Sequence, residues 1–136
     1  PSADLLAWRQ NGPLVIQQGA INPRVYNNSP ADWGYTLSGE APTWRSGVGL
    51  SADRRTLFYF CGPSLTMASL ADAMLAAGAA NAIQLDINRY WVHFTVVRSQ
   101  GGKSTLEALF PDAMQENIDR YLWPYTRDYF YVTAAP

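Results

Sequence analysis

Two polar side chains directly follow a short apolar run in the middle of the chain. The run Ala82–Leu85 predicts a short buried strand, which would deliver Asp86 and Asn88 to the strand's C-terminal end. Carboxylate and amide groups at such an end are well placed to meet a ligand. The alternative is structural, because Asp86 could merely cap a hairpin tip by accepting backbone N–H bonds.

Arg45 is the second candidate for chemistry, because it lies in a predicted strand that also carries Gly47 and Gly49. A guanidinium presents a fixed fork of donors that matches the oxygens of a phosphate. Glycines in a strand often let another backbone or a ligand come close. Taken alone, Arg45 is interpreted as a solvated residue at the end of a strand.

His93 is the only histidine of the chain. It lies in the alternating pattern Trp91–Val96, which predicts a strand with His93 on its more polar face. We expect this strand to pair with the strand that precedes Asp86, with residues 87–90 as the hairpin tip. His93 is then either a catalytic residue or a hydrogen-bonded surface residue, and a single histidine cannot form a histidine metal cluster.

The element that must position these groups is a helix over residues 66–77. Thr66 predicts the N-cap and Gly78 the left-handed residue at the C-terminal end. The helix would bury one face, because apolar residues recur at helical spacing. These residues are Met67, Leu70, Ala71, Met74 and Leu75.

The clearest hairpin pairs residues 44–50 with residues 56–61 across a turn at residues 52–55. Its second strand is a nearly continuous apolar and aromatic run, which predicts a position in the sheet interior with both faces covered. Upstream, residues 14–18 predict a strand that ends at Gly19, and residues 4–9 a short strand or a turn of helix.

The remaining segments predict loops and two short elements. Residues 22–42 are rich in Asn, Pro, Gly and Ser, which indicates a long surface loop. Trp33 and Tyr35 within this loop either stack on a sugar ring or attach the loop to the core. We further expect a loop over residues 99–104, a short helix within residues 111–121, and an aromatic strand over residues 127–132 that joins the sheet.

Composition places the chain among ordinary globular domains, with 136 residues of which 48% are hydrophobic and 15% charged. We expect one domain over residues 1–136 with an α+β fold, a mixed and largely antiparallel sheet with the helix packed on one face.

The net charge of −1 with scattered basic residues excludes an electrostatic footprint for nucleic acid. No segment reaches the length of a membrane span, and we recognise no signal peptide within these residues. Cys61 is the only cysteine, so no internal disulfide can form, and we interpret it as a packing residue.

Several of these segments together resemble the phosphodiester glycosidase family. The resemblance rests on TWRSGVGL at residues 43–50, on the helix pattern TxxxLAxxMLxxGAxxA from Thr66, and on the strand that ends in Leu85-Asp86. It spans roughly residues 14–96. Members usually continue Leu-Asp into LDGGGS, whereas this chain reads LDINRY, and they carry an upstream Asn-Gly-Gly-Phe-Phe type segment that is absent here.

The resemblance implies a hydrolase that cleaves a bond between a sugar and a phosphate. Arg45 would meet the phosphate, and Asp86 would act as the carboxylate near the anomeric carbon. It implies Asn88, Arg89, Tyr90 and His93 as substrate-binding residues, with Arg89 as a new phosphate contact. A divalent cation is left open as a cofactor. The chain would be the C-terminal part of a longer domain, with an upstream segment of the same precursor as a partner.

The second hypothesis is a non-catalytic glycan-binding or scaffolding domain of the same fold. The aromatic fraction of 13% is consistent with stacking on sugar rings, and equally with a large core. Either hypothesis predicts a carbohydrate or sugar-phosphate ligand and an extracellular or cell-envelope setting, for example in bacterial exopolysaccharide metabolism. The two differ at Asp86, because only an enzyme loses turnover when this residue becomes Asn.

Overall fold

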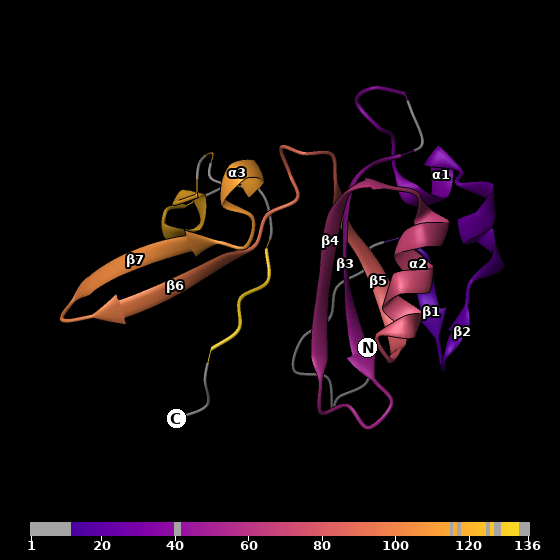
Figure 1. Cartoon of the computed structure of the whole chain (residues 1–136), viewed down its shortest axis with the longest axis horizontal. Coiled ribbons are helices and arrows are strands. Elements are labelled where there is room, and N and C mark those ends of the chain that lie inside the picture. The colour runs from indigo at the N-terminus through magenta and orange to yellow at the C-terminus, as the bar shows by residue number, and fades with distance from the viewer. Residues whose placement is uncertain are drawn as a thin grey trace. The chain divides into compact units, whose positions relative to one another are not determined.

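The computed structural model describes residues 12–39, 42–114, 116, 118–124, 126 and 129–133, and these divide into two compact units (Figure 1). The first unit ends at Val92 and the second begins at His93. The predicted element at residues 4–9 lies outside the described residues. The α+β fold class is confirmed, and every strand pairing in the described chain is antiparallel. The expectation of a single domain stays a prediction.

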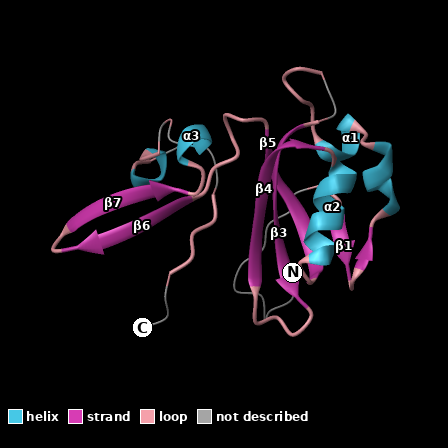
Figure 2. Ribbon diagram, in the orientation of Figure 1, coloured by secondary structure: helices cyan, strands magenta, loops and turns pink. Residues whose placement is uncertain are grey.

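The first unit is a five-stranded sheet with a helix packed on one face (Figure 2). The strand order is β2-β1-β5-β3-β4. The long central strands are β3 (Thr43–Ser51), β4 (Leu57–Leu65) and β5 (Ala79–Ile87), with β1 (Leu14–Gln17) and β2 (Ala20–Ile21) completing the sheet. The strand predicted upstream of Gly19 is therefore confirmed as β1.

Helix α2 (Met67–Ala76) forms where its caps predict it. The Thr66 side chain accepts from the Ser69 N–H, and the Ser69 hydroxyl accepts from the Thr66 N–H, which completes a reciprocal capping box. Gly78 has a φ of +97°, the left-handed conformation expected at the helix end. The predicted buried face is confirmed except at Leu75, which is 40% exposed because it lies beside the contact stripe.

Two glycines of β3 make room for α2 on the sheet. A methyl group added at Gly47 would overlap Met74 Cε and lie 2.9 Å from the carbonyl oxygen of Ile83. One added at Gly49 would lie 2.7 Å from Ala79 Cβ. The close approach predicted at these glycines is therefore real, and the group that approaches Gly47 is the helix.

The β3–β4 hairpin is confirmed, but the predicted interior position of its second strand is wrong for the described sheet. β4 pairs only with β3, and the interior places belong to β3 and β5. An apolar run shows that a strand packs on its faces, and it does not show how many neighbours the strand has. Phe58 and Phe60 pack against the core, while Leu57 is 58% exposed.

The strand preceding Asp86 also has different neighbours from those predicted. β5 pairs with β1 and β3, and no strand forms over residues 91–94. The chain turns at Asn88, whose carbonyl accepts from the N–H groups of Trp91 and Val92, and the next strand starts only at Thr95. The predicted hairpin between these segments is therefore wrong.

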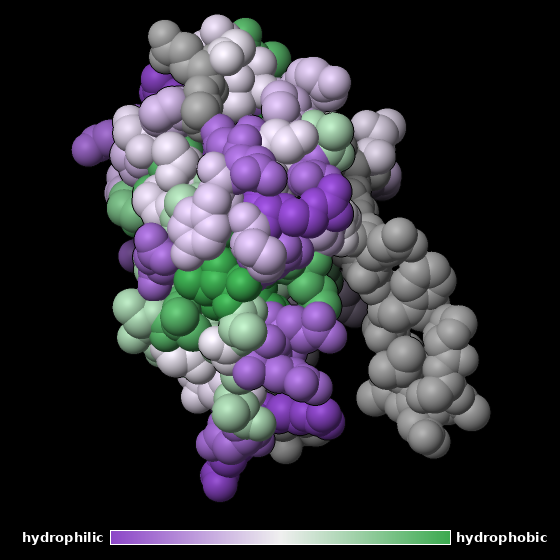
Figure 3. Space-filling model, turned by 90° about the vertical axis from the view of Figure 1, so that its right-hand side faces the viewer, coloured by the Kyte–Doolittle hydropathy of each residue, from purple (hydrophilic) through white to green (hydrophobic). Residues whose placement is uncertain are grey.

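The segment predicted as a long loop contains two short helices, η1 (Pro23–Asn27) and α1 (Pro30–Trp33). Trp33 is 1% exposed and its indole N–H donates to the carbonyl of Arg24, so it attaches this segment to the core. Tyr35 is 79% exposed. Figure 3 shows hydrophobic residues gathered in a band across the face on which α1 lies, bordered by hydrophilic ones.

The second unit contains the hairpin of β6 (Thr95–Gln100) and β7 (Lys103–Ala108), followed by α3 (Pro111–Met114) and η2 (Arg120–Leu122). The predicted loop at residues 99–104 is instead mostly strand. Only Gly101 and Gly102 form the turn, both at positive φ, as a tight two-residue hairpin turn requires. The short helix predicted within residues 111–121 is confirmed as α3.

The aromatic strand predicted at the end of the chain is wrong for its described part. Residues 129–133 form no strand, and Tyr131 and Val132 are 80% and 79% exposed. Residues 127 and 128 lie outside the described residues. A run of β-forming residues becomes a strand only where a sheet edge offers it hydrogen-bonding partners, and composition alone cannot supply that edge.

Candidate functional site at the end of the sheet

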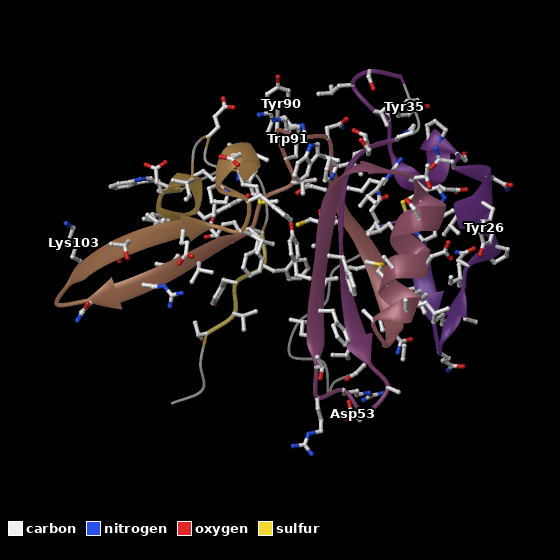
Figure 4. The ribbon with its side chains drawn as sticks, in the orientation of Figure 1. Tyr26, Tyr35, Asp53, Tyr90, Trp91 and Lys103 are labelled. Carbon is white, nitrogen blue, oxygen red and sulfur yellow. The ribbon has the colours of Figure 1, made fainter. Side chains whose placement is uncertain are left out.

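A groove lies at the end of the first unit's sheet and has a volume of about 270 Å³. It brings together three segments that are far apart in the sequence: the turn after β5, the segment after α1, and the paired ends of β3 and β4. Figure 4 shows Tyr90 and Trp91 at this end. The lining residues are Leu37, Ser38, Thr43, Trp44, Pro63, Ser64, Asn88, Arg89 and Tyr90.

Three of the predicted substrate-binding residues, Asn88, Arg89 and Tyr90, line this groove together. Arg89 is exposed and Tyr90 is 56% exposed, so both side chains can meet a ligand. The groove therefore offers one cationic side chain, an aromatic ring at Tyr90 and another at Trp44, and the hydroxyls of several small residues. Such a set suits a sugar that carries an anionic group.

Asn88 is 7% exposed, and its hydrogen bonds are made to other parts of the protein. Its Oδ1 accepts from the Leu37 N–H at 2.9 Å, and its Nδ2 donates to the Tyr35 carbonyl at 3.4 Å. Its own N–H donates to the carbonyl of Trp44 at 2.8 Å. Asn88 thus ties the segment after α1, which forms one wall of the groove, to the end of the sheet.

Asn88 and Ser64 both have positive φ, 70° and 53°, and both line the groove. Asn tolerates the left-handed region better than most residues, whereas Ser does so at a steric cost. Ser64 follows Pro63 at the irregular end of β4, where the register with β3 shifts between Thr43 and Arg45. Backbone held in sparsely populated conformations is common at ligand sites.

Arg45 is not among the groove-lining residues, because its side chain is 1% exposed. Its Nε donates to the carbonyl of Leu65 at 2.9 Å, and its Nη1 donates to Gln84 Oε1 at 3.0 Å. Gln84 in turn donates to the carbonyl of Trp33 at 2.9 Å. Burial lowers the pKa of the guanidinium from its usual value, but arginine stays charged at neutral pH. In this structure Arg45 links β3 to β5 and to the end of β4, and through Gln84 it connects to the end of α1.

Asp86 is half-buried in β5, next to an irregularity of that strand. The register between β3 and β5 shifts between Arg45 and Gly47, and the Ser46 hydroxyl donates to the Asp86 carbonyl at 2.8 Å. Asp86 lies two residues before Asn88 and does not itself line the groove. Its proposed catalytic role stays a prediction.

His93 belongs to the second unit and is not among the groove residues. Burial is the main cause that lowers the pKa of its imidazole, Arg120 lowers it further, and Glu116 acts in the opposite direction.

Among the described residues, no group of three or more His, Cys, Asp and Glu side chains could hold a metal ion. The described part of the chain also has no helix that is long and apolar enough to cross a membrane. Cys61 is half-buried, and burial raises its thiol pKa.

Sequence reasoning missed the groove residues that come from β4 and from the segment after α1. Pro63 within an apolar strand was an available signal, because proline in a strand marks an edge or an irregularity. Leu37 and Ser38 carried none, because the Asn88 side chain brings them to the sheet over 51 residues of sequence separation.

Comparison with known proteins gives one finding. The family model described as phosphodiester glycosidase matches residues 2–86, which is more than half of the chain. The match ends at Asp86, the second residue of the sequence LDINRY at residues 85–90. A search of curated proteins found no match.

Proposed function

Because the chain belongs to the phosphodiester glycosidase family, we propose that it acts as a hydrolase on a sugar-phosphate linkage in a sugar-1-phosphodiester. The observation that supports this most is that the family match and the groove share most of their residues. The match over residues 2–86 contains six of the nine described residues that line the groove, and the other three are Asn88, Arg89 and Tyr90.

In this proposal, the groove binds the ligand with Arg89 on the phosphate and with the rings of Tyr90 and Trp44 against the sugar. A guanidinium pairs with two phosphate oxygens, and aromatic rings offer apolar faces to a pyranose. The hydroxyls of Thr43 and Ser64 provide further hydrogen bonds. This assigns phosphate binding to Arg89, the one cationic side chain among the described residues that line the groove.

Asp86 is the proposed carboxylate of the reaction. Water adds its oxygen to the anomeric carbon while the bond from that carbon to the phosphate oxygen breaks. The carboxylate accepts the proton of the water, and the phosphate leaves with the bonding electron pair. A carboxylate in this place also stabilises the positive charge that develops on the sugar ring.

Arg45 enters the proposal with a different role from the one that the resemblance implies. With 1% exposure and bonds to Leu65 and Gln84, it would act by holding β3 and β5 together beneath the site. Asn88 likewise acts by positioning the groove wall. Substrate contact is assigned to Arg89 and Tyr90.

One observation favours the second candidate function, a glycan-binding domain without catalysis. The described residues that line the groove include no carboxylate, so a bound sugar would meet hydroxyl, aromatic and guanidinium groups alone. Either function fits a carbohydrate or sugar-phosphate partner and an extracellular or cell-envelope setting.

Hydrolysis of a panel of sugar-1-phosphodiesters, with and without divalent cations, tests the proposal. We expect turnover by the chain and its loss in Asp86→Asn, while Asp72→Asn, an exposed change on α2, retains it. Arg89→Gln should raise KM, and the exposed Arg55→Gln should not. Sugar binding without any turnover would reject the hydrolase in favour of the binding domain.

A further inference from the structure

Ser64 is a serine held in a backbone conformation that suits glycine. It lies at a β-bulge near the end of β4, since Thr43 pairs with Leu65 and Arg45 with Gly62, which leaves one extra residue in β4. Its φ is 53°, in the left-handed region, where a Cβ atom crowds the following carbonyl oxygen. The serine side chain is therefore placed here at the expense of stability.

The backbone contact beside this bulge does not need the serine side chain. The next residue, Leu65, accepts from Arg45 Nε through its carbonyl at 2.9 Å. A glycine at position 64 would adopt the same φ more easily and would leave this contact to the backbone of Leu65. A structural role therefore explains the bend in the chain but not the hydroxyl.

The Ser64 hydroxyl is available to a ligand. Ser64 is exposed, lines the groove and forms no side-chain hydrogen bond with any described residue. The Thr43 hydroxyl in the same groove differs, because it lies 3.5 Å from Asn88 Oδ1. Bulges next to ligand sites commonly re-aim a side chain, and strained backbone is common there too.

Ser64 and Arg89 line the groove from opposite sides of β3. Ser64 belongs to β4, Arg89 follows the end of β5, and β3 lies between these two strands in the sheet. The N–H of Asn88 donates to the Trp44 carbonyl, which holds the turn that carries Arg89 beside β3. Neighbouring strands lie about 5 Å apart, so the two sides are separated by about 10 Å at the backbone.

We propose that Ser64 is a specificity-determining residue whose hydroxyl bonds a hydroxyl of the sugar, while Arg89 on the other side of β3 holds the phosphate. The inference deepens the proposed function and rests on it for the class of ligand. It divides the groove into an anionic end and a sugar end, and it explains why a strained position carries a polar side chain.

Two variants remove the hydroxyl, Ser64→Ala and Ser64→Gly, and NMR titration measures the dissociation constants. The probes are inorganic phosphate and the 1-phosphates of glucose, galactose and mannose. Loss of one neutral hydrogen bond should weaken the tightest-binding sugar phosphate about three- to tenfold in both variants. Affinity for inorganic phosphate should stay unchanged in both, whereas Arg89→Gln should weaken the binding of every probe.

Urea unfolding separates the loss of the hydroxyl from a loss of stability. Because glycine escapes the strain that alanine keeps, the equilibrium constant for unfolding should be about fivefold lower in Ser64→Gly than in Ser64→Ala. The affinity loss should nevertheless be equal in the two. The matched control is Arg54→Gly, which relieves a φ of 61° at an exposed turn residue outside the groove and should leave every dissociation constant unchanged.

Unchanged affinity for the sugar phosphates in both Ser64 variants would overturn the proposal. So would an equal weakening of inorganic phosphate, because Ser64 would then not distinguish the sugar from the anion. Failure of hydrolysis with binding as expected would reject the proposed activity and keep the role of Ser64. If no sugar phosphate binds the unaltered chain, the class of ligand is wrong and the inference falls with it.

Discussion

Replacing Asn88 should release one wall of the groove while leaving the sheet intact. Asn88→Gly keeps a residue that adopts the φ of 70° freely but removes the side-chain bonds to the Leu37 N–H and the Tyr35 carbonyl, and the long contact of 3.5 Å from the Thr43 hydroxyl. The bond at 2.9 Å should contribute about 1 kcal/mol net, and the longer one at 3.4 Å less. We therefore expect Asn88→Gly to lower the free energy of unfolding by about 1 kcal/mol.

Asn88→Ala separates the backbone contribution from the side-chain contribution. Alanine loses the same side-chain bonds and also has to adopt a left-handed conformation that costs about 1 kcal/mol. Its expected destabilisation is about 2 kcal/mol. Asn88→Asp is the third variant, because its carboxylate still accepts from the Leu37 N–H but faces the Tyr35 carbonyl without a proton to donate.

Amide hydrogen exchange at Leu37, with urea unfolding for the global free energy, is the assay. The exchange rate at Leu37 should rise in Asn88→Gly and Asn88→Ala, and much less in Asn88→Asp. The amides of α2 should change only as far as the global stability does. Unchanged exchange at Leu37 in Asn88→Gly would refute the conclusion that this side chain holds the groove wall.

Two further predictions concern packing and pH. Gly47→Ala should destabilise the chain by about 1–3 kcal/mol, because the added methyl group meets both Met74 Cε and the Ile83 carbonyl, and shortening Met74 should recover only part of the loss in urea unfolding. His93, whose pKa burial lowers below its usual 6.5, binds fewer protons in the folded than in the unfolded state. The contribution of His93 to the free energy of unfolding should therefore be fully present above pH 6.5 and should fall as the pH drops from there through the folded-state pKa. If the free energy of unfolding depends on pH in the same way in His93→Gln, another group is responsible.

The elements that sequence reasoning found are those specified by neighbours along the chain. Thr66, Ser69 and Gly78 fix both ends of α2 through contacts within a few residues. The hairpin of β3 and β4 needs only a short turn. The partners of β5 were missed because they are distant, at Leu14 and Ile16 on one side and across β3 on the other.

The residues of the candidate site can be divided by the same criterion, according to whether sequence neighbours or distant contacts determine their positions. Asn88 was predicted because polar residues after a buried strand emerge at its end, and Arg89 and Tyr90 were named with the family resemblance. All three line the groove. The burial of Arg45 could not be predicted, because its side chain bonds Leu65 and Gln84, which are 20 and 39 residues away in the sequence. His93 was placed by assuming a hairpin that the turn at Asn88 excludes.

The packing of α2 on Gly47 couples the evolution of two positions that are distant in the sequence, 47 and 74. Because the space above this glycine is taken up by the end of the Met74 side chain, neither position can change size independently of the other. A lineage that acquires a larger residue at position 47 has to acquire a shorter one at position 74 and move the β5 backbone as well. Aligned homologues should therefore show covariation between these two columns, with glycine at 47 wherever a long side chain is kept at 74.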